Sequence, residues 1–345
     1  MESEPPRIGE SKVTSASSGS PSSSSGASFD REKLASSIKE ARGRIGSSVR
    51  KTRVEEIEVL PGSGVRVFAK MENEQDTGSF KLRGATNRIL RLTPEEKARG
   101  VVTASNGNHG LGVATAAARA GISADIYVSN SIASSKAQRI EKAGGRVFKS
   151  GENPLDAEVA GRQAAESSGR VFISPYNDWD VLAGQGTIAV ELLDQIPKVD
   201  AVFVAVGGGG LVGGIGAYLK HASPVTEVVG CWPENSAVLY ESMKAGQIGS
   251  FAEKPTVSES TAGGLEEGSI TFDVCKNAID SCVLVTEEQI LEAMRLVQRE
   301  KQWLIEGAAG VALAAFLKTA ERYKGKTVVV MICGGNVSER VRQLL

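Results

Sequence analysis

Short apolar strands alternate with helices along most of this chain, and this alternation constrains the fold more than any other feature. Four strand patterns occur at residues 101–103, 124–128, 146–148 and 171–173, with helical patterns between them. A second series of the same kind runs from residue 181 to residue 333. Strands that alternate with helices pair in parallel, because each helix carries the chain back to the end of the sheet where the next strand starts. The sequence therefore predicts an α/β protein with two open, mostly parallel twisted sheets flanked by helices.

The two series predict two domains. We expect residues 30–99 together with 177–345 to form a large domain, and residues 100–176 to form a small mobile domain. Residues 1–29 are rich in Ser, Gly and Pro, so they bury too little apolar surface to offset the entropy lost on ordering. We expect a disordered tail there. Its three glutamates accompany a single arginine, which argues against an organelle-targeting segment.

The composition excludes several classes of protein. The formal net charge is -1, whereas a nucleic-acid-binding protein usually shows a clustered basic excess. No apolar run approaches the roughly 20 residues that a membrane span needs, so we expect no membrane association. The four cysteines form no C-x-x-C pair and the two histidines are far apart, so zinc-type spacing is absent. Without a disulfide framework or a secretory signal, we expect a cytoplasmic protein.

A lysine in an apolar setting is the first candidate for chemistry. Lys81 lies between Phe80 and Leu82, with Gly78 and Gly84 close by. A lysine held against apolar groups has a lowered pKa, and its neutral amine can attack an aldehyde. Taken alone, such a lysine more often buries only its stem and keeps the charged tip in water.

Four consecutive glycines follow the apolar strand pattern at residues 201–206 and precede a helix. This stretch is Gly207, Gly208, Gly209 and Gly210, followed by Leu211. The glycines let the backbone approach a ligand closely, and a helix N-terminus favours a phosphate. The spacing of Gly208, Gly210 and Gly213 also matches a dinucleotide fingerprint, which leaves a nicotinamide-dependent dehydrogenase as an alternative.

Two more polar stretches follow strand patterns. Ser105, Asn106, Gly107, Asn108 and His109 precede a helix predicted from Leu111, and their side chains and N–H groups could bind a carboxylate or simply form a turn. The last strand ends in Cys333-Gly334-Gly335-Asn336. A buried thiol there is usually inert, although the glycines would let a planar ring lie against the backbone.

These motifs occur together in an order that resembles the fold-type II pyridoxal-phosphate enzymes, and among them the serine/threonine dehydratase and serine racemase family. The order is S-F-K-x-R-G-A, S-x-G-N-H-G, A-G-Q-G-T-I-A, G-G-G-G-L, E-G-A-A-G and C-G-G-N. The resemblance extends over residues 30–345. It implies a fold like the tryptophan synthase β subunit, pyridoxal 5'-phosphate as cofactor, a small amino acid as substrate and a homodimer.

The resemblance also implies roles for single residues. Lys81 would form a Schiff base with the cofactor aldehyde, and Lys81 is the expected catalytic residue. The other cofactor-binding residues would be Phe80 beside the ring, Asn108 at the ring hydroxyl, Cys333 at the ring nitrogen, Glu306, and Gly207, Gly208, Gly209, Gly210 and Leu211 at the phosphate. The substrate carboxylate would be held by Ser105, Asn106, Gly107 and His109.

Two departures from the racemase branch matter. Asn106 stands where that branch has a serine acting as a second base, and an amide cannot take a proton in that role. Trp232 and Val238 replace acids that bind a divalent cation in that branch, which leaves only Glu234. We therefore expect no metal site.

The sequence thus predicts a lyase that converts L-threonine, L-serine or both to a 2-oxo acid and ammonia by α,β-elimination. Serine racemase is the nearest alternative, and a β-replacement enzyme or a non-catalytic amino-acid sensor is less favoured. A 3-hydroxyaspartate-type dehydratase would need an added basic group, for which Arg83 and Arg139 are candidates.

Overall fold

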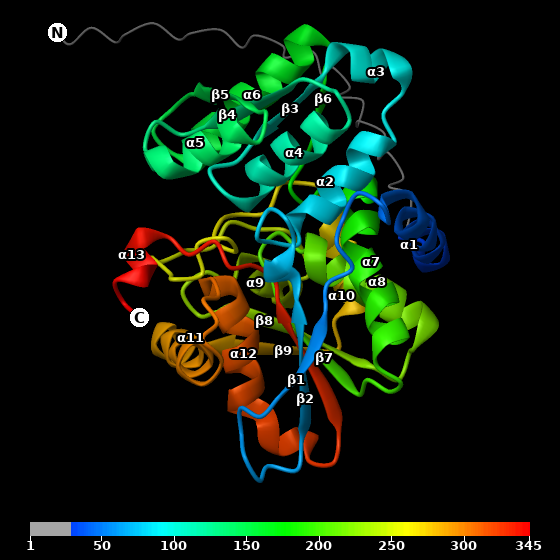
Figure 1. The fold of residues 1–345 in the computed structure, drawn as a ribbon, viewed down its shortest axis with the longest axis vertical. Coiled ribbons are helices and arrows are strands. Elements are labelled where there is room, and N and C mark those ends of the chain that lie inside the picture. The colour runs from blue at the N-terminus through cyan, green and yellow to red at the C-terminus, as the bar shows by residue number, and fades with distance from the viewer. Residues whose placement is uncertain (1–28) are drawn as a thin grey trace, which may run out of the picture.

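The computed structural model describes residues 29–345, so the predicted disordered tail lies outside the described residues except for Phe29. Two sheets form separate layers, one in the upper and one in the lower part of the molecule (Figure 1). They confirm the predicted fold class of two largely parallel sheets flanked by helices.

The large sheet has six strands in the order β1-β2-β10-β7-β8-β9. They are β1 (Val54–Ile57), β2 (Arg66–Met71), β7 (Ala201–Ala205), β8 (Glu227–Pro233), β9 (Ser281–Val285) and β10 (Thr327–Ile332). Only β1 runs antiparallel to its neighbour, β2. Strand β7 is buried along its whole length, as its continuous apolar sequence requires of a central parallel strand.

Helices cover both faces of the large sheet. Figure 1 shows α11 and α12 on one side and α1, α7 and α8 on the other. The helices of this part are α1 (Arg31–Ile45), α2 (Lys81–Leu90), α7 (Trp179–Gln195), α8 (Gly210–Ala222), α9 (Val238–Ala245), α10 (Ile270–Ala278), α11 (Glu287–Lys301), α12 (Gly307–Thr319) and α13 (Glu339–Arg342). Two 3-10 turns, η1 (Glu72–Glu74) and η2 (Ala320–Tyr323), complete it.

The small sheet has four parallel strands in the order β5-β4-β3-β6. They are β3 (Val101–Ala104), β4 (Ala124–Val128), β5 (Arg146–Lys149) and β6 (Val171–Phe172), and the helices around them are α3 (Pro94–Arg99), α4 (Asn108–Arg119), α5 (Ser134–Lys142) and α6 (Pro154–Ser168). A capping box between Thr93 and Glu96 starts α3.

The apolar core has two clusters, one for each sheet. The cluster of the small sheet also contains Leu82, Ala85 and Ile89, which belong to α2. Helix α2 packs against α4 and α7, so it joins the two halves of the molecule. The predicted domain boundaries stay a prediction, and this shared core shows that residues before position 100 support the small sheet.

The sequence patterns missed five elements, namely β1, β9, α9, α10 and α13. Strand β1 is an edge strand with two central glutamates, so its alternation of apolar and polar residues is lost. Helix α4 begins at Asn108 rather than at Leu111, because the polar residues before Leu111 already form its first turn. No helix among residues 29–345 has the length and apolar character needed to span a membrane.

Candidate active site

Lys81 is the first residue of α2, and it lies half-buried where the two halves of the molecule meet. Its Nζ donates a hydrogen bond of 2.9 Å to the carbonyl of Pro175. Burial lowers the pKa of Lys81 to about 8, although the nearby carboxylate of Glu306 opposes the shift. The ring of Phe80 lies 5.1 Å from this nitrogen. The structure therefore gives Lys81 the partly neutral amine that the sequence predicted.

The loop before Lys81 is paired with the end of the last strand. The N–H of Phe80 donates to the carbonyl of Cys333 at 3.0 Å, and the N–H of Gly335 donates to the carbonyl of Gly78 at 3.0 Å. Gly78 has a φ of +76°, which favours glycine. These bonds place the two predicted motifs side by side. Burial raises the pKa of the Cys333 thiol, which keeps it neutral.

The tetraglycine turn joins β7 to α8 and presents unpaired donors. Within residues 29–345, no hydrogen bond is formed by the N–H groups of residues 207–211. The first intrahelical bond runs from the N–H of Gly213 to the carbonyl of Gly209. A Cβ on Gly208 would lie 2.4 Å from the ring of Tyr176, so that position has no room for a side chain. The turn is a site for an anion with several oxygens.

Lys81 and the tetraglycine turn are connected through one short segment. Pro175 accepts the hydrogen bond from Lys81, and the next residue, Tyr176, packs its ring on Gly208 and its Cα and Cβ on Gly210. Sequence patterns gave no sign of this segment, because neither residue belongs to a motif or a periodic element.

Most of the predicted carboxylate-binding side chains bond to the protein itself. The Oγ of Ser105 accepts from the N–H of Gly107 at 3.1 Å. The amide of Asn106 is engaged at both ends by Ser129, at 2.7 and 2.9 Å. The donors left for a substrate carboxylate are the Ser105 hydroxyl and the N–H groups in the first turn of α4, which lack intrahelical acceptors.

His109 has a structural contact rather than a free ring. Its Nε2 donates to the carbonyl of Ile173 at 3.0 Å, and its buried Nδ1 has no partner among residues 29–345. Burial and the nearby Lys81 lower the pKa of His109 to about 3. A neutral ring whose free nitrogen is an acceptor does not attract a carboxylate, so we assign the side chain to bracing α4 against the end of β6.

Asn108 and Glu306 form the polar centre of the site. The Nδ2 of Asn108 donates to both carboxylate oxygens of Glu306, at 3.1 and 2.9 Å. Ser260 donates to the same carboxylate at 2.8 Å. Burial raises the pKa of Glu306, and the bonds from Asn108 and Ser260 oppose that shift. Ser260 comes from the long segment between α9 and α10, and no sequence signal marked it.

The two arginines considered for an acidic substrate differ in position. Arg83 is completely buried and pairs with Glu72 and Glu191, each at 2.8 Å, so it does not reach the site. Arg139 is exposed on α5 and donates from Nη2 to Oδ1 of Asn336 at 2.9 Å.

The segment expected to lack a cation site has few oxygen ligands. Trp232 is completely buried, and the carboxylate of Glu234 lies 3.9 Å from the amine of Lys318. Among residues 29–345, no group of three or more His, Cys, Asp and Glu side chains could hold a metal ion.

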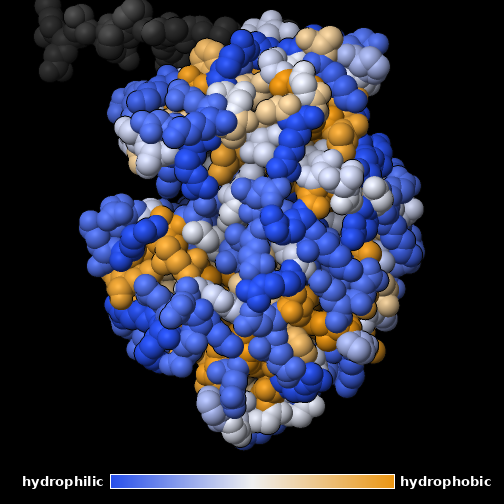
Figure 2. Space-filling model, viewed as in Figure 1, coloured by the Kyte–Doolittle hydropathy of each residue, from blue (hydrophilic) through white to orange (hydrophobic). Residues whose placement is uncertain are grey.

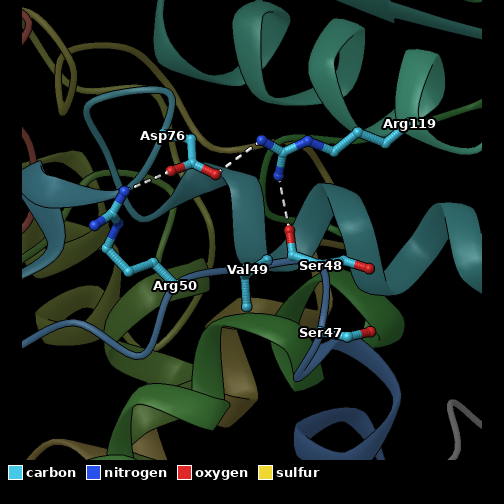
Figure 3. Close-up of a pocket in the computed structure, with 6 residues that line it drawn as sticks. All are labelled: Ser47, Ser48, Val49, Arg50, Asp76 and Arg119. Carbon is cyan, nitrogen blue, oxygen red and sulfur yellow. Dashed lines mark hydrogen bonds and ion pairs between the residues drawn. The ribbon is translucent and has the colours of Figure 1, made fainter.

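An open cavity of about 510 Å³ lies elsewhere, where α4 meets the segment after α1 (Figure 3). Its lining residues are Ser47, Ser48, Val49, Arg50, Asp76 and Arg119. Asp76 accepts from Arg119 at 2.8 Å and from Arg50 at 3.1 Å, and Arg119 also donates to the carbonyl of Ser48. None of the predicted site residues lines this cavity. We therefore interpret the ion pairs of Asp76 at its wall as a contact between the two halves of the molecule.

Pyridoxal phosphate fits the groups that the structure brings together. Its aldehyde requires an amine that is partly neutral, which Lys81 supplies. Its phosphate requires several free donors, which the N–H groups of residues 207–211 supply at the start of a helix. Its flat ring requires a narrow space, and the glycines after Cys333 leave the backbone bare there. A Cβ on Gly334 would lie 2.5 Å from the Glu306 carboxylate.

Comparisons with known proteins agree with this fit. A model of the family "Pyridoxal-phosphate dependent enzyme" matches residues 45–334. The chain is 38% identical over 301 residues to the L-threonine ammonia-lyase of Thermotoga maritima, covering 87% of this chain and 75% of that protein. The solved structure of processed threonine deaminase isoform 2 from Solanum lycopersicum matches with a TM-score of 0.86 at 30% identity, covering 92% of this chain and 94% of that one. Maize serine racemase matches with a TM-score of 0.84 at 30% identity, covering 89% and 95%.

The chain belongs to the family of pyridoxal-phosphate-dependent enzymes. This result confirms the predicted family and cofactor. It leaves the nicotinamide-dependent alternative without support, because the matching family depends on pyridoxal phosphate.

Proposed function

We propose that this protein is a pyridoxal-phosphate-dependent ammonia-lyase that converts L-threonine, L-serine or both into a 2-oxo acid and ammonia. The proposal rests mainly on Lys81, an enclosed amine with a lowered pKa beside the Asn108–Glu306 pair. The relatives named as threonine ammonia-lyase and threonine deaminase support the same reaction.

Each group of site residues would bind a different part of the cofactor. Lys81 would hold the cofactor through Nζ, and the N–H groups of residues 207–211 would bind its phosphate. Asn108, Phe80, Cys333 and Glu306 would surround its ring. When bound, pyridoxal phosphate supplies the group that joins the substrate amine and accepts the electron pair from the α-carbon.

The protein's own groups then select the bond that breaks. The first-turn N–H groups of α4 would bind the substrate carboxylate and orient the α-hydrogen toward Lys81. Once the substrate amine has replaced Lys81 on the cofactor, the freed neutral Nζ of Lys81 would take the α-proton as general base. The β-hydroxyl would leave as water, and the proton that it gains balances the one that Lys81 has taken. The resulting enamine is hydrolysed to the 2-oxo acid and ammonia, so the overall reaction consumes no oxidant.

The structure of the two halves supports a closing motion of the small domain, residues 100–176, over the substrate. Figure 2 shows the surface indented between the part that holds α5 and the part that holds α13. Polar contacts cross between the halves, including Lys136 with Glu259 at 3.8 Å and Arg162 with Glu266 at 2.8 Å. Slower proteolysis of the segments around residues 100 and 176 when substrate is bound would support closure, and unchanged cleavage would contradict it.

Two further parts of the proposal concern the protein in the cell. We propose that the protein is a homodimer, and sedimentation equilibrium would test this.

We also propose a cytoplasmic location. The four free cysteines fit a reducing compartment, and cell fractionation would test the proposal.

The decisive experiment compares purified protein with Lys81→Ala. We expect the wild-type protein to show a visible absorption band with pyridoxal phosphate and to form 2-oxo acid from L-threonine or L-serine. Lys81→Ala should lose both the band and the activity. Lys39→Ala, which removes an exposed lysine on α1, is the control and should keep both. A wild-type protein that gains no band on addition of the cofactor would refute the proposal.

A further inference from the structure

Arg139 is an exposed cation whose guanidinium is hydrogen-bonded to the side-chain amide of an asparagine rather than paired with a carboxylate. Its Nη2 donates to Oδ1 of Asn336 at 2.9 Å. Among residues 29–345 it takes part in no ion pair, whereas Lys136, one turn earlier on α5, pairs with Glu259 at 3.8 Å. Helix α5 faces the segment that leads to α13 across the indentation of the surface (Figure 2). The Arg139 contact therefore crosses between the two halves.

Asn336 connects Arg139 to the interior of the site through further hydrogen bonds. Its Nδ2 donates to the carbonyl of Thr77 at 2.9 Å and to Oδ1 of Asn108 at 2.6 Å. An amide has one accepting end and one donating end. Because the guanidinium of Arg139 only donates and the carbonyl of Thr77 only accepts, these two groups together hold the Oδ1 end of Asn336 toward α5 and its Nδ2 end toward Asn108.

Asn108 is the end of this chain of hydrogen bonds. Its Oδ1 accepts from Asn336, so its Nδ2 is left to face the buried carboxylate of Glu306 at 2.9 Å. If the amide of Asn336 turned over, its oxygen would face the oxygen of Asn108, and Asn108 would turn over or lose its partner. The orientation of Asn108 therefore depends on Asn336, a half-buried residue of the other half, whose amide is held in turn by Arg139.

We propose that Arg139 is a positioning residue that acts through Asn336 to fix the amide of Asn108 at the cofactor ring. The inference rests on the proposed function, because it assigns Asn108 to the cofactor. Arg139 and Asn108 belong to residues 100–176 and Asn336 to the rest of the chain. The contact thus forms only when the two halves adopt the arrangement seen here, and it couples that arrangement to the geometry of the site.

A different role for Arg139 would be direct binding of an acidic substrate side chain. The two roles predict different results. A positioning residue affects cofactor binding and the turnover of every substrate, whereas a substrate contact affects KM for an acidic substrate alone.

The test compares Arg139→Met, Arg139→Lys and the control Lys136→Met in the full chain. The readouts are the dissociation constant of pyridoxal phosphate, the absorption spectrum of the bound cofactor, and kcat and KM for L-threonine and for 3-hydroxyaspartate. Loss of one hydrogen bond from a charged donor corresponds to about a tenfold change. We expect Arg139→Met to weaken cofactor binding about tenfold, to shift the spectrum and to lower kcat with little change in KM. Arg139→Lys, which keeps a charged donor, should recover most of the loss, and Lys136→Met should resemble wild type.

Asn336→Asp provides a second test of the same chain of bonds. Its carboxylate can still accept from Arg139 but cannot donate to Asn108, so the variant should match Arg139→Met. Wild-type cofactor affinity and spectrum in Arg139→Met would overturn the proposal, as would an effect confined to KM for 3-hydroxyaspartate. A wild-type protein that binds the cofactor but forms no 2-oxo acid would refute the proposed function, and the cofactor measurements would still test Arg139.

Discussion

Lys81 shows how burial converts a common surface side chain into a reactive group. The ordinary pKa of a lysine, 10.5, leaves almost no neutral amine at neutral pH, and burial lowers the pKa of Lys81 to about 8. The carboxylate of Glu306 acts in the opposite direction by favouring the charged amine, so part of the Lys81 population stays charged at neutral pH. Lys81 can therefore be charged or neutral at a pH near 8.

The first prediction concerns the rate at which protein freed of cofactor takes up pyridoxal phosphate. Only the neutral amine of Lys81 attacks the aldehyde, so the rate should rise with pH and level off above about 8. Between pH 7 and pH 9 the increase should be about tenfold, from the change in the neutral fraction. Stopped-flow absorbance measures it. A rate that still climbs steeply at pH 10 would show an ordinary lysine.

The second prediction is that the protein does not racemise serine, and it rests on Asn106. Removing and returning the α-proton on opposite faces requires a base on each face, whereas elimination requires one. The amide of Asn106 is held by Ser129 at both ends and cannot act as that second base. Incubation with L-serine should yield pyruvate without appreciable D-serine, as chiral chromatography can show. Accumulation of D-serine at a rate near that of pyruvate would contradict this reading.

Among the elements, the turn from β7 to α8 carries the strictest spatial requirement. Gly209 has a φ of +84°, and a Cβ there would lie 2.8 Å from the Sγ of Cys275. Gly208 is limited by the Tyr176 ring rather than by its dihedral angles. The turn therefore needs consecutive glycines for two separate reasons, space at Gly208 and backbone conformation at Gly209.

The third prediction follows from this turn. Gly208→Ala places a methyl group where the ring of Tyr176 lies, 2.4 Å away, so the ring or the turn must move. We expect loss of about 1–3 kcal/mol of stability and at least a tenfold weaker binding of pyridoxal phosphate. Thermal unfolding and equilibrium dialysis measure the two effects. The control Gly43→Ala, in a helix where the added methyl meets no atom within 4 Å, should show neither.

The segment after β8 gives the fourth prediction. Trp232 fills its interior position, and Glu234 faces Lys318. A hard divalent cation prefers several oxygen ligands, which this segment does not bring together. Activity after dialysis against EDTA should equal activity before it. Strong inhibition that Mg²⁺ or Ca²⁺ reverses would reveal a cation site that this arrangement does not predict.

At the scale of the whole molecule, a buried ionic network anchors the helix that carries Lys81. Arg83 on α2 lies between Glu72 and Glu191, and Lys70 of β2 donates to Glu191 at 2.8 Å. Burial lowers the pKa of Lys70, while the neighbouring Glu72 and Glu191 oppose that shift. The network ties the large sheet to α2 and α7, on which the site is built.

The fifth prediction tests this network. Glu191→Ala would leave Arg83 and Lys70 with one carboxylate between them in a buried setting, and we expect a loss of about 3–5 kcal/mol. Urea unfolding of protein freed of cofactor measures it. Glu40→Ala removes a glutamate from an exposed pair with Arg44 and should cost at most about 1 kcal/mol. Equal effects of the two substitutions would mean that the network does not anchor the fold.

Much of the fold could be predicted from local patterns, because periodicity and capping are properties of neighbouring residues. Strand β4 has the predicted bounds, residues 124–128, and helix α5 lies between two of the predicted strands, as the helical pattern there indicated. Edge strand β1 and the short helices α9 and α10 could not be predicted in this way, because contacts with distant segments stabilise them more than their own sequence does.

For the site, the sequence by itself determined the chemical groups: the lysine of the S-F-K motif, the glycine turn and the family they indicate. Only the tertiary structure decided what each group does there. It bonds the amide of Asn106 to Ser129 and the ring of His109 to the carbonyl of Ile173. It also brings Pro175 to Lys81, Ser260 to Glu306 and Arg139 to Asn336. The reason is physical. A motif specifies which groups are present, whereas burial and hydrogen-bond partners come from residues far apart in the chain and set the charge and orientation of those groups.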